Sequence, residues 1–220
     1  MKSNATQKVY LFTRFERFWH WLQAALILGL MGTGLEIHGT FALLGYARAV
    51  RLHNFLGLTW VVLFCFILFW AFTTGEWRQY IPTTRKLLAM ARYYALGMFK
   101  GEAKPVRTSP GAKHNPLQRL AYLGIVTLLL PVQMVSGLLY YTYNQWTAGG
   151  LAAFLDLGIV ALVHTAFFFL LLAFLVSHLY LATLGHTLFS MVKTMVTGWA
   201  EIPATQEVHD WEWADRHGQG

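Results

Sequence analysis

The sequence predicts an all-α integral membrane protein whose core is a bundle of four transmembrane helices. Apolar residues of the set AVILMFWYC make up 56% of the 220 residues, and only 12% are charged. The mean hydropathy of +0.43 is higher than a water-soluble surface tolerates. This composition excludes an ordinary soluble enzyme. It also excludes a disordered or nucleic-acid-binding chain, because the net charge of +7 has so little polar surface around it.

Four apolar runs are long enough to cross a bilayer, which takes about 20 residues of helix at about 1.5 Å per residue. The predicted spans are residues 19–37, 53–72, 120–141 and 157–184. We expect no cleavable signal peptide, because a polar stretch precedes the first run and no small-residue cleavage site follows it. Residues 1–220 are therefore predicted to form one membrane domain.

The distribution of Lys and Arg predicts the orientation. Fifteen of the 17 basic residues lie in the N-terminal stretch, in the loop of residues 73–119, or in the tail of residues 186–220. Only Arg48 and Arg51 lie in the loop between the first two spans. Because cytoplasmic loops are enriched in Lys and Arg, both termini and the long loop are predicted to be cytoplasmic, in a bacterial inner membrane.

The long loop contains a predicted amphipathic helix over residues 85–100, which we expect to lie on the cytoplasmic membrane surface. Its expected apolar side comprises Leu87, Leu88, Ala91, Tyr94, Ala95 and Met98. A docking platform for a partner is the alternative. The acidic, Trp-rich tail around His209–Trp213 is expected to be peripheral or bound to a partner.

Placing a histidine inside a membrane span costs free energy, so such histidines indicate a functional site. Four of the nine histidines lie in or at the start of spans: His20, His53, His164 and His178. His164 and His178 are 14 residues apart, which places them on one helix face about 21 Å apart along the axis. Two ligands at that distance cannot share one ion, but they can serve two cofactors, one in each leaflet.

Depth in the membrane predicts how these histidines pair. His53 and His164 come early in spans that begin outside, so they form an outer pair; His20 and His178 form an inner pair. Two axial imidazoles per site favour b-type haem. A single cysteine, Cys65, and the absence of a C-x-x-C-H motif exclude covalent c-type attachment and an iron–sulfur site. Gly57 and Gly137 would leave room for the macrocycle.

Alternative assignments of the histidines stay open. His38 can replace His53 at the outer end of the first span, and His186 can replace His178, although His164 to His186 spans about 33 Å, the full hydrocarbon thickness. A membrane histidine can also serve only to hydrogen-bond neighbouring helices. His114, His209 and His217 lie in aqueous segments.

The chain resembles, over nearly its whole length, the di-haem cytochrome b (gamma) subunits of membrane-bound formate dehydrogenase and the thiosulfate reductase cytochrome b. Both belong to the bacterial cytochrome b561 and nickel–iron hydrogenase cytochrome b superfamily. The matching stretches are Arg14-Phe-Glu-Arg-Phe-Trp-His20-Trp21, Thr33-Gly34-Leu35, His53-Asn-Phe-Leu-Gly57, Lys113-His-Asn115-Pro-Leu-Gln118, His164 through His178-Leu-Tyr180, and Met195-Val-Thr-Gly198.

The resemblance implies four helices, two haem b groups and a quinone site beside the cytoplasmic haem. By this resemblance, His20 and His178 would bind the iron of the inner haem. His53 and His164 would bind the iron of the outer haem. Asn115 occupies the quinone-contacting position of the family. Its neighbours His114 and Gln118, together with His186, are expected at the same cytoplasmic boundary, where a quinone that takes electrons must also take protons.

The arginines near the two predicted haems are candidates to pair with haem propionates. These are Arg14 and Arg17 at the inner site and Arg48 and Arg51 at the outer one. Interfacial anchoring explains the same residues equally well.

We therefore expect an electron-transfer membrane anchor with no substrate chemistry of its own. It would link a periplasmic iron–sulfur subunit, and a catalytic subunit with molybdenum, tungsten or another metal, to menaquinone or ubiquinone. A thiosulfate or polysulfide reductase and a nickel–iron hydrogenase are alternative complexes. A metal-ion transporter is a rival class, but it would add carboxylates along its path, and Glu36 and Asp156 are both at span ends. A haem-free anchor and a higher oligomer also stay open.

Overall fold

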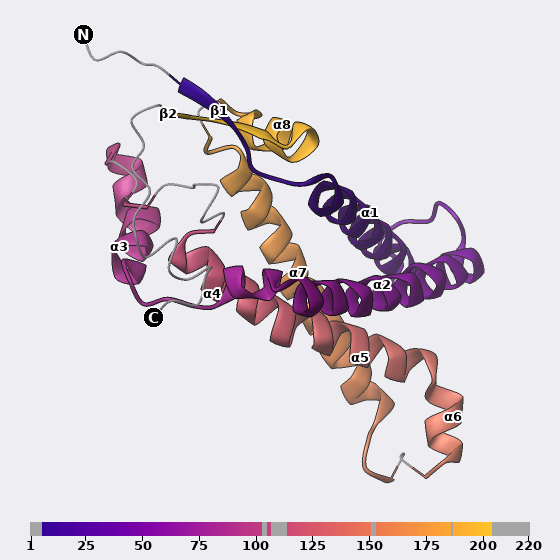
Figure 1. Cartoon of the computed structure of the whole chain (residues 1–220). Helices are drawn as coiled ribbons and strands as arrows, with labels where there is room; N and C mark the ends of the chain where they lie inside the picture. Colours follow the sequence, from indigo (N-terminus) through magenta and orange to yellow (C-terminus); the bar gives the residue numbers. More distant parts are fainter. Residues whose placement is uncertain (1–5, 103–104, 107–113, 151–152, 186, 204–220) are drawn as a thin grey trace. The chain divides into compact units, whose positions relative to one another are not determined.

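The computed structural model describes residues 6–102, 105–106, 114–150, 153–185 and 187–203, and these are mainly helical (Figure 1). Contacts divide the chain into two compact units. We call residues 18–69 and 127–181 the histidine unit, and residues 1–17, 70–126 and 182–220 the terminal unit.

Long apolar helices occupy the predicted spans. Three of them are long and apolar enough to cross a membrane: α2 (Tyr46–Thr74), the continuous helical run Pro116–Tyr141, and α7 (Leu157–Ala182). The remaining predicted span lies in α1 (Arg14–Ile37), which has 24 residues and is interrupted by the polar side chains of His20, Gln23 and Glu36. The all-α prediction is thus confirmed, and three of the four predicted spans coincide with helices that are long and apolar enough to cross a membrane.

The run Pro116–Tyr141 changes its helical pitch in the middle. It consists of α4 (Pro116–Gly124), the π-helical segment η4 (Ile125–Leu129) and α5 (Leu130–Tyr141). Pro131 stands two residues after the π segment and has no N–H to donate to the preceding turn. The wider π turn accommodates this defect without ending the helix.

The loop between α1 and α2 is tied to the end of α1. The buried carboxylate of Glu36 accepts hydrogen bonds from the backbone N–H groups of Leu43, Leu44 and Gly45, at 2.8, 2.6 and 2.7 Å. Such bonds to a charged acceptor are stronger than neutral ones. Glu36 therefore fixes where α2 begins and how it returns along α1.

A short helix follows α5. This helix, α6 (Tyr143–Ala148), carries the buried Trp146, whose indole N–H donates to the carbonyl of Leu139. The indole ties the start of the second connecting loop to the end of α5.

The two terminal segments pair with each other, which the sequence analysis did not predict. Strand β1 (Thr6–Tyr10) lies antiparallel to β2 (Trp199–Pro203), with Lys8 opposite Glu201. Helix α8 (Ser190–Thr197) leads into β2 through Gly198, which has a φ of +87. A Cβ at Gly198 would lie 2.7 Å from the carbonyl oxygen of Phe12, so only glycine fits there.

The predicted loop helix exists but is not a regular α-helix. After the 3₁₀ turn η1 (Glu76–Tyr80) come α3 (Leu87–Arg92), the π segment η2 (Tyr93–Gly97) and the 3₁₀ segment η3 (Met98–Lys100). Met90 and Gly97 are its buried positions, whereas Leu88 is 85% exposed. Leu88 belongs to the apolar side that we expect on the membrane surface, and α3 contacts α4.

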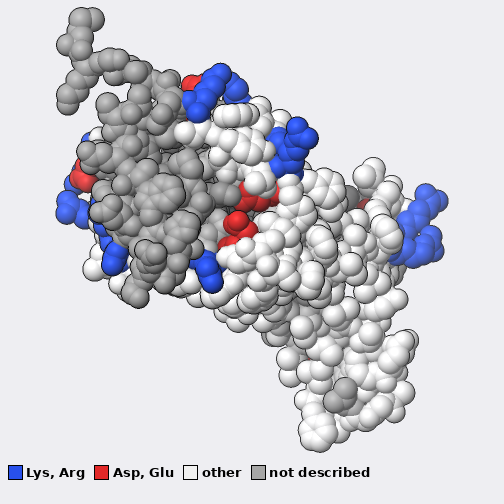
Figure 2. All heavy atoms as spheres, viewed as in Figure 1, with Lys and Arg blue, Asp and Glu red and all other residues white. Residues whose placement is uncertain are grey.

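Charge is scarce on the surface of the long helices. In Figure 2 the region over α5 and α6 shows neither basic nor acidic atoms. Large apolar side chains are mostly exposed on α2 and α7 as well, among them Val62, Leu162 and Phe169. A surface of this kind fits lipid rather than water, so the chain is an integral membrane protein.

Candidate metal centres

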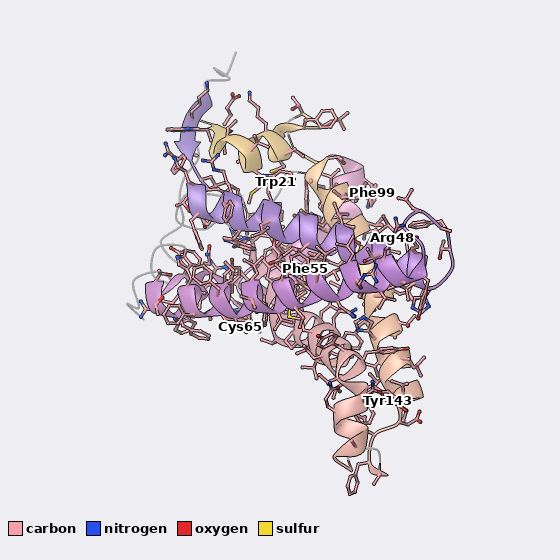
Figure 3. The ribbon with its side chains drawn as sticks, turned by 90° about the vertical axis from the view of Figure 1, so that its right-hand side faces the viewer. Trp21, Arg48, Phe55, Cys65, Phe99 and Tyr143 are labelled. Atoms are coloured by element: carbon pink, nitrogen blue, oxygen red, sulfur yellow. The ribbon has the colours of Figure 1, made fainter. Side chains whose placement is uncertain are left out.

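His53 and His164 face each other within the histidine unit. His53 lies on α2 and His164 on α7, and their ring centroids are 6.3 Å apart with an interplanar angle of 76°. Helices α1 and α2 lie side by side (Figures 1 and 3), and His53 on α2 contacts Thr33 on α1. Their predicted depth in the membrane pairs the same two residues.

His20 and His178 form a second facing pair in the same unit. Their ring centroids are 6.2 Å apart, with an interplanar angle of 48°. The ring of His178 also stacks on Phe174, one turn earlier on α7, at 5.7 Å. His164 and His178 are 14 residues apart on α7 and therefore place the two pairs about 21 Å apart along the helix.

The spacing within each pair fits two imidazoles on opposite sides of one metal. Metal–imidazole bonds are about 2.0–2.1 Å long, which puts the two ring centroids about 6.3 Å apart. Each pair supplies only two ligands, and among the described residues no group of three or more His, Cys, Asp or Glu side chains could hold an ion. A metal that brings its own equatorial ligands, as haem iron does, needs only such an axial pair.

Glycines stand against both rings of the His53–His164 pair. A Cβ at Gly137 would lie 3.1 Å from Cε1 of His164, and a Cβ at Gly34 would lie 3.6 Å from Cε1 of His53. Gly57 would contact only Leu30, at 3.8 Å. A side chain at Gly137 would therefore crowd the ring of His164, whereas a Cβ at Gly57 would make only an ordinary van der Waals contact with Leu30.

Hydroxyl groups hold the two rings of this pair. Oγ1 of Thr33 on α1 lies 2.9 Å from Nδ1 of His53, and Oγ of Ser136 on α5 lies 3.0 Å from Nδ1 of His164. Both hydroxyls are buried. The side-chain nitrogen of Gln133 is 3.2 Å from Nε2 of His164, and its oxygen is buried without a partner. A metal on Nε2 of His164 would require this amide to turn away.

The His20–His178 pair lacks comparable partners. Nδ1 of His20 is buried and has no hydrogen-bond partner. In the part of the chain that the structure describes, neither His20 nor His178 has a recorded hydrogen bond to its ring. The two pairs thus share their spacing but differ in how their rings are held.

The residues predicted to bind propionates have different surroundings. Arg48 (labelled in Figure 3) and Arg51 are exposed near the start of α2, and neither forms an ion pair within the described ranges. Arg14 is exposed as well, whereas Arg17 donates to the carbonyl of Val196 in α8. His38, the alternative ligand to His53, is exposed beyond the end of α1 and belongs to neither facing pair.

Three of the four residues predicted for the quinone site, His114, Asn115 and Gln118, lie at the start of α4 in the terminal unit. Asn115 caps α4: its oxygen accepts from the N–H of Gln118, and the side chain of Gln118 accepts from the N–H of Asn115, both at 3.0 Å. The amide nitrogen of Asn115 donates to the hydroxyl of Tyr94 at 3.2 Å. Two of the predicted residues therefore have a structural task that the sequence analysis did not assign.

His114 belongs to an aromatic cluster beside this cap. Its ring stacks on Tyr80 at 5.4 Å and meets the edge of Tyr122 at 4.8 Å. Burial raises the pKa of the Tyr80 hydroxyl, so this group stays protonated at neutral pH. His186, His209 and His217 lie outside the described residues.

Sequence reasoning missed Thr33, Ser136 and Gln133. All three lie in apolar spans, and Thr33 and Ser136 follow a pattern that is common in membrane helices, in which a hydroxyl bonds the carbonyl four residues earlier. Thr33 directly precedes Gly34 and Ser136 directly precedes Gly137, and both glycines lie close to a histidine ring. That hydroxyl–glycine doublet is the signal that could have identified Thr33 and Ser136.

Known proteins similar to this chain are cytochromes. The chain is 32% identical over 212 residues to the putative cytochrome YdhU of Escherichia coli K12, covering 90% of this chain and 78% of that protein. It is 25% identical over 227 residues to the probable Ni/Fe-hydrogenase 1 B-type cytochrome subunit of the same organism, covering 90% and 93%.

A family model described as prokaryotic cytochrome b561 matches residues 11–198, which include both histidine pairs. These similarities support the superfamily expected from the sequence, without singling out the formate dehydrogenase gamma subunit. The chain belongs to the prokaryotic cytochrome b561 family and is a membrane cytochrome of the kind that binds b-type haem.

Proposed function

We propose that this chain is a di-haem cytochrome b subunit that carries electrons between a partner outside the membrane and quinone on the cytoplasmic side. The observation that carries the proposal is the presence of two facing histidine pairs with centroid spacings of 6.3 and 6.2 Å. His53 and His164 would hold the outer haem, and His20 and His178 the inner one. Haem supplies the one-electron chemistry; the protein fixes its position and electronic surroundings.

Four membrane crossings are part of the proposal. The pairing of β1 with β2 supports them, because two strands can pair only if both terminal segments lie on the same side of the membrane. An even number of crossings follows, and the three most apolar helical runs give an odd number. Helix α1 is the natural fourth, since its 24 residues span about 36 Å and it carries His20 toward His178.

The inner bacterial membrane, with both termini in the cytoplasm, is the proposed location. Fifteen of the 17 basic residues lie in the termini and the long loop, as the positive-inside rule requires. Arg48 and Arg51 are the exceptions and begin α2, where positive charge opposes the helix dipole. Ion pairs of Arg48 and Arg51 with the propionates of the outer haem, or with an outer partner, would offset this cost.

For the quinone site we propose Asn115, with His114, Gln118 and His186 as further contacts. They are polar groups on the segments that face cytoplasmic water in the proposed orientation, and quinone reduction consumes protons there. Because both ends of the Asn115 amide are engaged, a quinone would have to compete with Tyr94 for its nitrogen.

We propose that the partner is an iron–sulfur subunit of a larger oxidoreductase, with its catalytic subunit on the periplasmic side. The hydrogenase relative is named as a probable B-type cytochrome subunit of Ni/Fe-hydrogenase 1. Formate dehydrogenase, thiosulfate or polysulfide reductase and hydrogenase differ in the catalytic subunit. The proposal for this chain covers only what they share.

A haem count on the purified protein tests this function. We expect about two b-type haems per chain from the pyridine haemochrome spectrum, and one in each of the variants H20A and H53A. The matched control is H38A, which changes an exposed histidine and should retain both haems. A wild-type protein with fewer than two haems, or an H53A protein that keeps both, would contradict the proposal.

A further inference from the structure

The two histidine pairs differ in their hydrogen bonds, and this difference has a redox consequence. The hydroxyl of Thr33 lies 2.7 Å from the carbonyl of Gly29 on its own helix. A carbonyl cannot donate, so the hydroxyl hydrogen points to it. What the hydroxyl offers His53, at 2.9 Å, is a lone pair, and therefore Nδ1 of His53 carries a hydrogen and donates.

Ser136 repeats the arrangement on the opposite ligand. Its hydroxyl lies 2.7 Å from the carbonyl of Val132 and 3.0 Å from Nδ1 of His164. The hydrogen again goes to the backbone, and the lone pair accepts from the ring. In both rings the proton sits on Nδ1, which leaves Nε2 as the metal-binding nitrogen.

A ligand imidazole that donates from its far nitrogen becomes more basic and gives more electron density to the metal. Greater donation favours the oxidised metal and lowers its reduction potential. Both rings of the His53–His164 pair receive this support. His20 does not, because its Nδ1 is buried without a partner, and no hydrogen bond to the ring of His178 is recorded among the described residues.

We propose that Thr33 and Ser136 lower the reduction potential of the haem at His53 and His164 and place it below that of the haem at His20 and His178. They act through the ligand rings and are positioning residues. This inference rests on the proposed function, which supplies the two haems, the outer reductant and the inner quinone. Under that function the ordering makes electron movement from the outer to the inner side favourable and gives the cytochrome a direction.

Potentiometric titration of the purified di-haem protein tests the proposal. The variants are T33V and S136A, which remove the accepting oxygen with little change of shape. Each should shift the lower-potential component to a more positive value and leave the higher one in place, and the double variant should shift it further. The conservative variants T33S and S136T should restore the wild-type value.

The matched control is T59V on α2. The hydroxyl of Thr59 bonds the carbonyl of Phe55 at 2.8 Å in the same way, but no histidine contact is recorded for it. T59V should leave both potentials unchanged. A shift of the higher component in T33V or S136A, or two bound haems with unshifted potentials, would overturn the inference and leave the proposed function intact.

The ordering can also be measured without touching Thr33 or Ser136, should those variants fail to fold. H53A should retain one haem, and its potential should match the higher wild-type component. A retained haem at the lower potential would reverse the ordering. Loss of both haems or of none would instead count against the proposed ligand pairing, so the two failures are distinguishable.

Discussion

At the scale of single residues, the space beside the ligand rings is the most sensitive property of the proposed outer haem site. Gly137 has no room for a larger side chain, because a Cβ there would lie 3.1 Å from Cε1 of His164. We predict that G137V displaces this ring and lowers the haem content by about one haem per chain. G137A should lower the occupancy less, since a single methyl group requires only a small shift of the ring.

The control for this prediction is Gly32 on α1, where a Cβ would meet nothing within 4 Å. G32A should bind the same amount of haem as the wild type. The measurement is the haem-to-protein ratio of purified variants, together with thermal unfolding to detect misfolding. Full haem content in G137V would show that the ring of His164 can move without losing its ligand role.

The residue scale also shows what the sequence could and could not predict. Depth arguments paired His20 with His178 and His53 with His164, because helix rise and span direction depend only on chain position. Thr33, Ser136 and Gln133 escaped, because their orientation depends on how helices rotate against each other. Glu36 was treated as a carboxylate at a span end, and its three backbone contacts depend on a turn that periodicity does not describe.

At the scale of elements, the cap of α4 separates two roles of Asn115. As an N-cap it satisfies the N–H of Gln118, and N115A should lower the stability of the terminal unit by about 1 kcal/mol. N115D and N115S keep a capping oxygen but remove the amide nitrogen that contacts Tyr94. We predict that both restore the stability lost in N115A.

Quinone reduction by the same variants distinguishes a cap from a quinone contact. If the amide nitrogen of Asn115 binds quinone, as proposed, N115D and N115S should raise the KM for a water-soluble quinone several-fold despite their restored stability. The reaction is followed as reoxidation of the reduced haem. Wild-type KM values in both variants would show that Asn115 only caps α4 and does not bind quinone. The proposed quinone contacts of His114 and Gln118 would then lose their support, because both residues lie beside Asn115.

Regular elements were easier to predict than their interruptions. The apolar runs located α7 and the helical run Pro116–Tyr141 to within a few residues, because a bilayer demands length and apolarity, whereas α2 begins seven residues before the predicted span. The π segments at Ile125–Leu129 and Tyr93–Gly97 were not foreseen, and the second moves the apolar positions of the loop helix out of simple 3.6-residue register. The strands β1 and β2 pair residues almost two hundred positions apart, which local patterns do not reveal.

At the scale of the whole molecule, the pairing of the termini constrains the topology. Gly198, the contact of Arg17 with Val196, and the register of Lys8 with Glu201 together join the beginning of the chain to its end. If the paired segments β1 and β2 are cytoplasmic, the side of the membrane on which each loop lies is fixed by the order of the four spans. The outer pair then lies near the periplasm, and the long loop lies inside.

Cysteine labelling tests this topology, and the chain suits the method because Cys65 is its only cysteine and is exposed on an apolar helix. In a C65A background we predict that K8C and E201C react with a membrane-impermeant maleimide only in inside-out vesicles. R48C should react only in right-side-out vesicles. F55C, at an exposed apolar position of α2, should react in neither, because lipid covers it.

The double variant K8C/E201C tests whether β1 and β2 pair within one chain. Residues opposite each other on antiparallel strands have Cα atoms about 4.5–5.5 Å apart, a distance that a disulfide bridges, so mild oxidation should cross-link the two termini within one chain. Cross-linking together with labelling from the inside requires an even number of crossings and makes α1 the fourth span. Labelling of K8C and E201C from opposite sides would instead leave three spans and place His20 outside the membrane core, and the inner haem site would fail with it.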